Sequence, residues 1–287
     1  MRRDIRDAFP EMSEAQVDAT VRDCYRWLVE SLFDAAKFSR VATGADAAEM
    51  VETEGFEVLR MPGRKVGVIF VTGHVGAWEL SGLASAAIGY PVISLARPRS
   101  NPFIERQIAR LRESTGQKML GKKGAMRPAI CALRTGQNLA ALVDQDARSH
   151  GVFVDFFGRP ASTISTVARL SIMTGAPVAF AYGRRIPGQN RFCIHLSELI
   201  LPDRQAPLQQ EILRITRCFT RALEDVVREH PAEWLWLHRR WKTSPGKPAP
   251  PGRATLPAAD AQPDAESSCG PAAGGGSPAT RGMRPAN

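Results

Sequence analysis

The sequence predicts an α/β fold, a single-domain sandwich in which a largely parallel central sheet is flanked by helices. Two observations carry this prediction. Short apolar runs rich in β-branched residues, typical of strands buried on both faces, alternate with segments whose apolar residues recur at helical spacing. The chain also has 287 residues, 44% of them hydrophobic, which is enough to bury a core of ordinary size.

The predicted elements follow one another in a regular order. Ser13 opens the first helix with a capping-box pattern, because Gln16 stands three residues later. Gly175 and Pro177 mark the end of a later helix. The expected helices cover 13–38, 76–88, 101–114, 123–134, 163–174 and 207–229, and the expected strands cover 66–72, 91–96, 138–143, 177–183 and 191–198. Alternation of this kind favours parallel pairing of the strands.

The composition changes sharply at residue 244. From 244 to 287 the chain holds nine of its 21 prolines, seven of its 24 glycines and no aromatic residue. Such a segment buries too little apolar surface to offset the entropy lost on ordering. We therefore expect one domain over 1–243, with an amphipathic helix region in 1–40, and a disordered tail rich in proline, glycine and alanine over 244–287.

The charge balance limits the classes of partner. With 38 Lys and Arg against 29 Asp and Glu, the net charge of +9 favours a phosphate-bearing lipid, an acidic carrier protein or a nucleic acid. Nucleic acid is disfavoured because no RNA-binding pattern is present and the basic residues are spread thinly.

No apolar run approaches the roughly 18 residues that span a bilayer, and no secretory signal opens the chain. The five cysteines are scattered without CxxC spacing, so we predict reduced thiols and no metal site.

Three predicted strands are followed by ionisable residues set among small ones. His74 follows the first, Arg97 the second, and Asp144 and Asp146 the third. Because open α/β sheets bind ligands outside the carboxyl ends of their strands, we expect these residues to converge on an active site. Glu79, in the next helix, can point back toward the imidazole, and a carboxylate on one ring nitrogen makes the other a better base. The alternative is a satisfied loop histidine and a carboxylate at a helix N-terminus.

In order and spacing, these motifs resemble the late acyltransferases of lipid A biosynthesis, the lauroyl/myristoyl transferase family with its HxxxxE motif. The resemblance covers about residues 10–243 and rests on His74-x4-Glu79, Arg97-Pro98, Asp144-Gln145-Asp146, Phe157-Gly158, Thr163, Glu224 and the run from Pro231 to Lys242. It implies a fold similar to glycerolipid acyltransferases. It also implies transfer of a fatty acyl chain from acyl carrier protein to a hydroxyl of a lipid A precursor, a phosphorylated glycolipid.

The resemblance further implies the residues that act. His74 and Glu79 match the catalytic dyad of the family, and Arg112 and Asp144 match two further catalytic residues. In this interpretation His74 removes the hydroxyl proton, Glu79 stabilises the imidazolium, and the oxygen attacks the thioester directly. Replacing His74 or Glu79 by alanine is expected to abolish turnover. The expected substrate-binding residues are Arg97, Asp146, Arg239 and Arg240.

The chain carries no GxSxG elbow, and no cysteine stands in a nucleophile motif. We therefore expect no covalent acyl-enzyme, and no cofactor beyond the acyl carrier protein thioester, which is a substrate.

Two segments that mix aromatic and basic residues leave alternatives open. The stretch 234–242 either contacts lipid or carrier protein or closes the core, and its His238 is interpreted as structural. Arg22 and Arg26 share the first helix with aromatic residues, which suits a membrane surface, although a helix that only docks on the core has the same pattern. Because the family normally has a transmembrane helix just upstream, we expect peripheral attachment to the cytoplasmic face of the inner membrane, or a start codon placed too late.

Other functions fit the same motifs. The acceptor could be a different glycolipid or a secondary-metabolite lipid, the enzyme could release acyl groups to water, or the chain could bind lipid without catalysis. A pure binder has no need of a base, so the paired His74 and Glu79 argue against the last of these.

Overall fold

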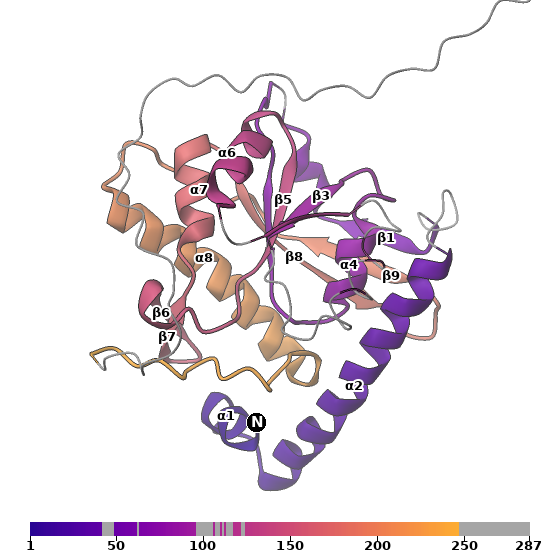
Figure 1. Cartoon of the computed structure of the whole chain (residues 1–287). Helices are drawn as coiled ribbons and strands as arrows, with labels where there is room; N and C mark the ends of the chain where they lie inside the picture. Colours follow the sequence, from indigo (N-terminus) through magenta and orange to yellow (C-terminus); the bar gives the residue numbers. More distant parts are fainter. Residues whose placement is uncertain are drawn as a thin grey trace, which may run out of the picture. The chain divides into compact units, whose positions relative to one another are not determined.

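A seven-stranded sheet forms the centre of the fold in the computed structural model (Figure 1). The structure describes residues 1–41, 49–61, 63–95, 106, 110, 112, 117–121 and 124–246. The strand order is β1-β9-β8-β2-β5-β3-β4, and neighbouring strands pair in parallel except for the antiparallel pair β8 and β9. The strands are β1 Val51–Glu54, β2 Ile69–Thr72, β3 Val92–Leu95, β4 Lys118–Leu120, β5 Asn138–Leu142, β8 Val178–Arg185 and β9 Phe192–Leu196. The predicted, largely parallel sheet is confirmed.

Helices cover both faces of this sheet (Figure 1). On one face α4 packs against β8 and α2 lies against α4; on the other, α6 packs on β5, α8 packs on β8, and α7 contacts both helices. The helices are α1 Arg2–Ala8, α2 Glu14–Val41, α4 Trp78–Ala84, α6 Met126–Arg134, α7 Thr166–Thr174 and α8 Leu208–Glu229, with 3-10 turns η1 Phe56–Leu59, η2 Arg148–His150 and η3 Pro231–Glu233. The predicted α/β sandwich is therefore confirmed.

The first long helix begins where its capping box predicts. The Ser13 amide donates to Gln16 Oε1 at 2.8 Å, and the Gln16 amide donates to Ser13 Oγ at 3.3 Å. The inner face of α2 is buried, with Cys24, Trp27 and Phe38 against the core. In the part of the chain that is described, no helix has the length and apolar composition needed to cross a bilayer.

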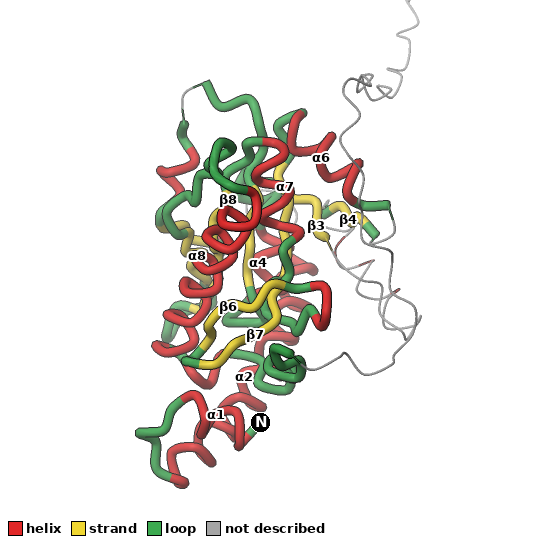
Figure 2. Tube along the Cα trace, turned by 90° about the vertical axis from the view of Figure 1, so that its left-hand side faces the viewer, coloured by secondary structure: helices red, strands yellow, loops and turns green. Residues whose placement is uncertain are grey.

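Some boundaries differ from the sequence prediction for physical reasons. The helix predicted from 163 begins at Thr166, because residues 159–163 form the second strand of an antiparallel hairpin, β6 Val152–Phe156 with β7 Arg159–Thr163. Figure 2 shows this hairpin beside α8, which β6 contacts. The helix predicted over 76–88 ends at Ala84 in a turn. Most of the helix expected over 101–114, and most of the tail expected over 244–287, lie outside the described residues.

Candidate active site

The register of the two central strands brings His74 and Asp144 together. β2 and β5 run parallel, and Thr72 at the end of β2 stands beside Leu142 at the end of β5. His74 and Asp144 each lie two residues beyond this pair, in the loops that leave the same edge of the sheet. The predicted convergence of these two strand exits is therefore confirmed. The third exit, which carries Arg97, lies outside the described residues.

The Asp144 carboxylate holds the His74 side chain by hydrogen bonds. His74 Nδ1 lies 2.9 Å from Asp144 Oδ1, and the His74 amide donates to Oδ2 at 2.7 Å. The indole Nε1–H of Trp234 also donates to Oδ2, at 3.0 Å. A carboxylate that accepts from Nδ1–H leaves the lone pair on Nε2, the nitrogen that can accept a proton from a substrate.

The electrostatic surroundings keep Asp144 ionised. Asp144 is fully buried, and burial alone would raise the pKa of its carboxyl group. The nearby His74, through its charge and its two hydrogen bonds, and then His238, bring that pKa well below its ordinary value instead. The carboxylate is thus available to stabilise an imidazolium at any pH near neutrality.

Glu79 occupies a different position from the one expected. The sequence interpretation placed its carboxylate against the imidazole, but the carboxylate that bonds His74 is Asp144. Glu79 instead pairs with Arg112: Arg112 Nε donates to Oε1 at 3.0 Å, and the two side chains are only 12–13% exposed. The physical reason is that Glu79 lies in the first turn of α4, whereas strand register places Asp144 directly beside the His74 loop.

Two glycines in the His74 loop are required by close contacts. A Cβ added at Gly73 would lie 3.2 Å from Asp144 Oδ2 and 2.8 Å from a methyl of Leu223. Gly76 has φ +56°, and a Cβ there would lie 2.2 Å from the carbonyl oxygen of Gly183. The tight turn around His74 is thus set by the close approach of neighbouring elements, which leaves no space for a Cβ at either glycine.

The C-terminal segment of the domain closes over the same loop. The Leu235 amide donates to the His74 carbonyl at 3.0 Å, and Val75 and Trp234 form an antiparallel bridge. Trp234 and Trp236 are buried, with exposed fractions of 0% and 1%. For these two tryptophans, the core-closing alternative is the one observed.

His238 lies against the His74 imidazole. Its ring centroid is 4.4 Å from that of His74, and its buried Nε2 has no hydrogen-bond partner in the part of the chain that is described. Burial, followed by the charge of His74, lowers the pKa of His238, so its imidazole is neutral at neutral pH. The sequence interpretation treated this residue as structural. It reaches the site from a distant segment, and no spacing pattern marks it.

The remaining substrate-binding candidates differ in exposure. Arg239 is exposed, and Asp146 Oδ2 accepts from the Thr243 hydroxyl at 2.9 Å. Arg240 is only 1% exposed, and its guanidinium donates to the carbonyl of Ser162 and to the hydroxyl of Thr163. The position of Arg240 therefore matches a core-closing role, since its cation is bonded within the protein and is not presented to solvent.

An apolar cavity lies beside this site, between α4 and the sheet. Trp78, whose ring centroid is 5.6 Å from that of His74, lines it together with Glu79 and Arg112. The rest of its wall is mostly apolar or small, with a few uncharged polar side chains: Phe56, Phe70, Thr72, Ser81, Gly82, Ser85, Ile88, Tyr90, Val92, Ser94, Leu95, Gln117, Ala140, Ala141, Leu142, Ala181 and Ile194. An ion pair at one part of a largely apolar wall suits a ligand with a polar head and a hydrocarbon chain.

His74, Asp144 and His238 also bring three potential metal-ligating atoms within 4.8 Å of one another. The Asp144 carboxylate, however, already accepts three N–H bonds. This donor arrangement favours a histidine base over a metal centre.

The described residues thus place a buried imidazole–carboxylate pair next to a largely apolar cavity on a mixed α/β sheet, an arrangement that suits an enzyme acting on a substrate with a hydrocarbon chain. The model of the bacterial lipid A biosynthesis acyltransferase family matches residues 1–243. The chain belongs to this family, and it is an acyltransferase.

The individual relatives found share only about a quarter of their residues with this chain, or fewer. The chain is 26% identical over 253 residues to a lipid A biosynthesis lauroyltransferase of Escherichia coli K12, covering 85% of this chain and 78% of the relative. It is 23% identical over 184 residues to a phosphatidylinositol mannoside acyltransferase of Mycobacterium tuberculosis, covering 61% and 55%. Among solved structures, a 1-acyl-sn-glycerophosphate acyltransferase of Thermotoga maritima aligns with a TM-score of 0.40 at 16% identity, over 70% of this chain and 81% of that one.

Proposed function

We propose that this acyltransferase moves a fatty acyl chain from acyl carrier protein to a hydroxyl group of a lipid A precursor. The observation that carries the proposal is the His74–Asp144 pair beside an apolar cavity. Family membership supports the glycolipid acceptor. The net charge of +9 suits both an acidic carrier protein and a phosphorylated lipid.

The proposed reaction needs no covalent acyl-enzyme. His74 Nε2 takes the proton of the acceptor hydroxyl while Asp144 stabilises the imidazolium that forms. The oxygen attacks the thioester carbonyl, and the tetrahedral intermediate expels the carrier thiolate, which recovers the proton from His74. The products are an ester and a free carrier thiol.

Arg112 is the proposed stabiliser of the oxyanion. The Arg112 guanidinium lines the cavity, and its two-point pairing with Glu79, through Nε at 3.0 Å and Nη2 at 3.2 Å, fixes its orientation there. In this scheme Glu79 is a positioning residue that acts through Arg112. An oriented donor of this kind contributes roughly 3 kcal/mol to the stabilisation of the transition state.

The direct test incubates the purified protein with labelled acyl carrier protein thioester, with and without a lipid A precursor. Labelled acylated lipid is the expected product. Free fatty acid alone would identify a hydrolase, and no product with any acceptor would contradict the proposal. Because one relative is a phosphatidylinositol mannoside acyltransferase, a mannosylated phospholipid is the second acceptor to include.

We also propose that the acyl chain occupies the cavity between α4 and the sheet. Ser85 lines this cavity at the C-terminal end of α4, whereas Glu79 stands in the first turn. Replacing Ser85 by phenylalanine is expected to shift donor preference toward shorter chains by about tenfold, because each methylene lost from an apolar pocket changes discrimination by roughly this factor. The measurement is competition between carrier proteins loaded with acyl chains of different length.

Ser85→Ala is the matched control for this experiment, because it removes the same hydroxyl without filling the cavity. Its chain-length preference should equal that of the wild type. If Ser85→Phe lowers the rate equally for all chain lengths, the acyl chain lies elsewhere.

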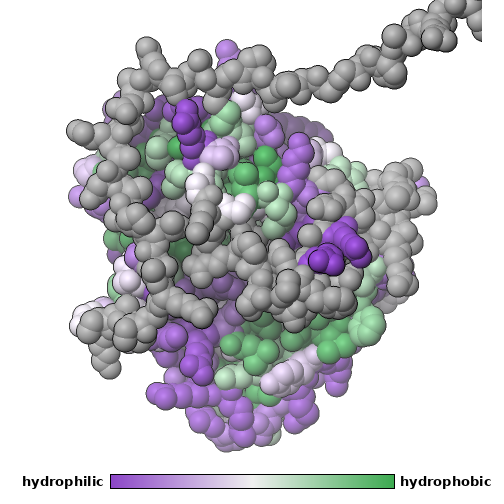
Figure 3. All heavy atoms as spheres, viewed as in Figure 1, coloured by the Kyte–Doolittle hydropathy of each residue, from purple (hydrophilic) through white to green (hydrophobic). Residues whose placement is uncertain are grey.

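The outer face of α2 supports attachment to a membrane surface, which we propose is the cytoplasmic face of the inner membrane. Figure 3 shows apolar side chains gathered over this helix. The exposed fractions at helical spacing are 50% for Tyr25, 53% for Val29, 53% for Leu32 and 71% for Phe33. The exposed Arg22 and Arg26 adjoin this stripe, and basic residues beside an apolar stripe suit anionic lipid.

The double change Leu32→Ser and Phe33→Ser is expected to reduce binding to anionic phospholipid vesicles by at least about tenfold, because it removes two side chains that would enter the lipid. Cosedimentation measures the bound fraction. The control changes Leu201 and Leu208 to serine, since both are exposed but lie outside α2. Equal losses in both variants would contradict attachment through α2.

A further inference from the structure

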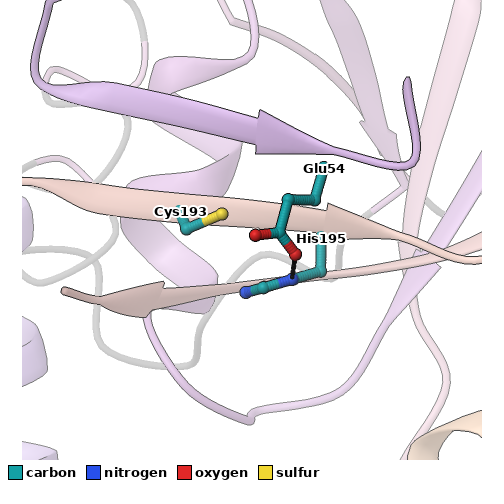
Figure 4. Close-up of side chains that lie close together, drawn as sticks. All are labelled: Glu54, Cys193 and His195. Carbon is teal, nitrogen blue, oxygen red and sulfur yellow. Dashed lines mark ion pairs between the residues drawn. The ribbon is translucent and has the colours of Figure 1, made fainter. Parts of the chain in front are cut away.

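The edge of the sheet carries a second group of reactive side chains, separate in sequence from the His74 loop. Glu54 ends β1, and Cys193 and His195 lie on β9 (Figure 4). Strand register places Glu54 beside His195, and the two β9 residues, two positions apart, point to the same face of the sheet. The carboxylate, thiol and imidazole atoms all lie within 4.8 Å of one another.

The three side chains are held in place to different degrees. Cys193 is buried, and the His195 ring stacks on Tyr182 with centroids 4.8 Å apart and an interplanar angle of 16°. His195 Nδ1 lies 2.7 Å from Glu54 Oε2, while the Glu54 side chain is 67% exposed. The site thus has two candidate ligands on one strand, β9, and one carboxylate at the end of β1 that is exposed to solvent.

We infer that Glu54, Cys193 and His195 bind Zn²⁺, with water completing a tetrahedral set. Thiolate and imidazole together select zinc over the hard cations Ca²⁺ and Mg²⁺, which prefer oxygen ligands. Zinc–ligand bonds of about 2.0–2.3 Å place tetrahedral ligands roughly 3.3–3.8 Å apart, so atoms that lie within 4.8 Å of one another, with His195 Nδ1 2.7 Å from Glu54 Oε2, reach this spacing by shifts on the order of 1 Å. The Glu54 side chain, 67% exposed, has room to shift relative to the two β9 residues.

The charged residues on the strands next to Cys193 are paired with other side chains, so no cation among them is directed at the proposed site. Arg184 stands opposite Cys193 in the β8–β9 register and forms an ion pair with Glu233, with Nη2 2.7 Å from Oε1. Glu52, opposite Cys193 on β1, pairs with Arg191 at 2.7 Å. Binding would release the thiol proton of Cys193 to the solvent and link the edge strand β1 to β9. The inference is independent of the proposed acyl transfer.

The test adds Zn²⁺ to the full chain after treatment with a chelator and a reductant. Calorimetry should give one ion per chain, and Tm should rise by about 5 °C at free zinc 100-fold above Kd. Cys193→Ser, His195→Ala and Glu54→Gln should each weaken binding by at least about tenfold. The matched controls Cys218→Ser, His150→Ala and Glu57→Gln should bind as the wild type does.

Cobalt(II) distinguishes this site from the His74, Asp144 and His238 group, which has no sulfur. A cobalt–thiolate charge-transfer band that disappears in Cys193→Ser supports the assignment. Should Cys193→Ser fail to fold, Glu54→Gln keeps the test decisive, because its side chain is exposed. Absence of zinc binding, or binding that survives in both Cys193→Ser and Glu54→Gln, would overturn the inference.

Discussion

Replacing His74 by alanine is expected to lower kcat by about 10⁴-fold, which leaves no detectable transfer. In the proposed mechanism the imidazole takes the proton of the acceptor hydroxyl, and of its described neighbours neither Asp144 nor His238 can replace it. Asp144 is held ionised, and His238 has its pKa lowered by burial, so it is a weaker base. The measurement is the initial rate of transfer from labelled acyl carrier protein thioester at saturating acceptor.

The control for this variant is His150→Ala, because His150 is exposed in η2. Circular dichroism and Tm should show that both variants keep the fold, since removal of the His74 ring leaves the backbone bond from Leu235 to His74 intact. If His74→Ala retains a rate near that of the wild type, a different group is the base and the proposed mechanism is wrong.

The sheet could be predicted from the sequence because its strands are buried on both faces. Runs such as 66–72 and 138–143 contain almost no polar residue, so the periodicity identifies them without tertiary information. β1 was not predicted. In β1, Val51–Glu54, only the first residue is buried, and the polar composition of the segment is typical of a loop. An edge strand of this kind is defined by its partner β9 and not by its own composition.

The β6–β7 hairpin was missed for a related reason. Its turn residues, Phe157 and Gly158, have φ of +55° and +67°, and phenylalanine is an unusual residue for a left-handed turn position. Contacts from elsewhere hold it there: the Phe157 amide donates to Glu224 Oε2 at 2.7 Å, and its ring packs on Phe9. These tertiary contacts outweigh the local conformational preference of phenylalanine. Such contacts cannot be predicted from a single sequence.

The site was predictable as a set of residues but not as a set of contacts. Strand exits placed His74 and Asp144 at one edge, as found. Which carboxylate meets the imidazole depends on strand register and on the direction of a helical side chain, and neither follows from spacing. His238 and Trp234 come from a segment about 160 residues later, so only the folded chain brings them to His74.

Replacing Asp144 by asparagine is expected to lower kcat by about 10³–10⁴-fold. The carboxylate accepts from the amide and ring of His74 and from Trp234, whereas an asparagine has one acceptor oxygen for these three donors. Its NH₂ group can also face Nδ1, which places the proton on Nε2 and removes the lone pair that acts as base. The same assay measures the loss, and the exposed Asp225→Asn provides the matched control.

A parallel variant, Glu79→Gln, separates the roles of the two carboxylates. If Glu79 acts by orienting Arg112, this change should cost about 10²–10³-fold, less than Asp144→Asn, and combining it with Arg112→Ala should add little further loss. If Glu79 instead supports the imidazole directly, its loss should equal or exceed that of Asp144→Asn. Because each change keeps the size of the side chain and removes one charge, the order of the two rates decides which carboxylate serves His74.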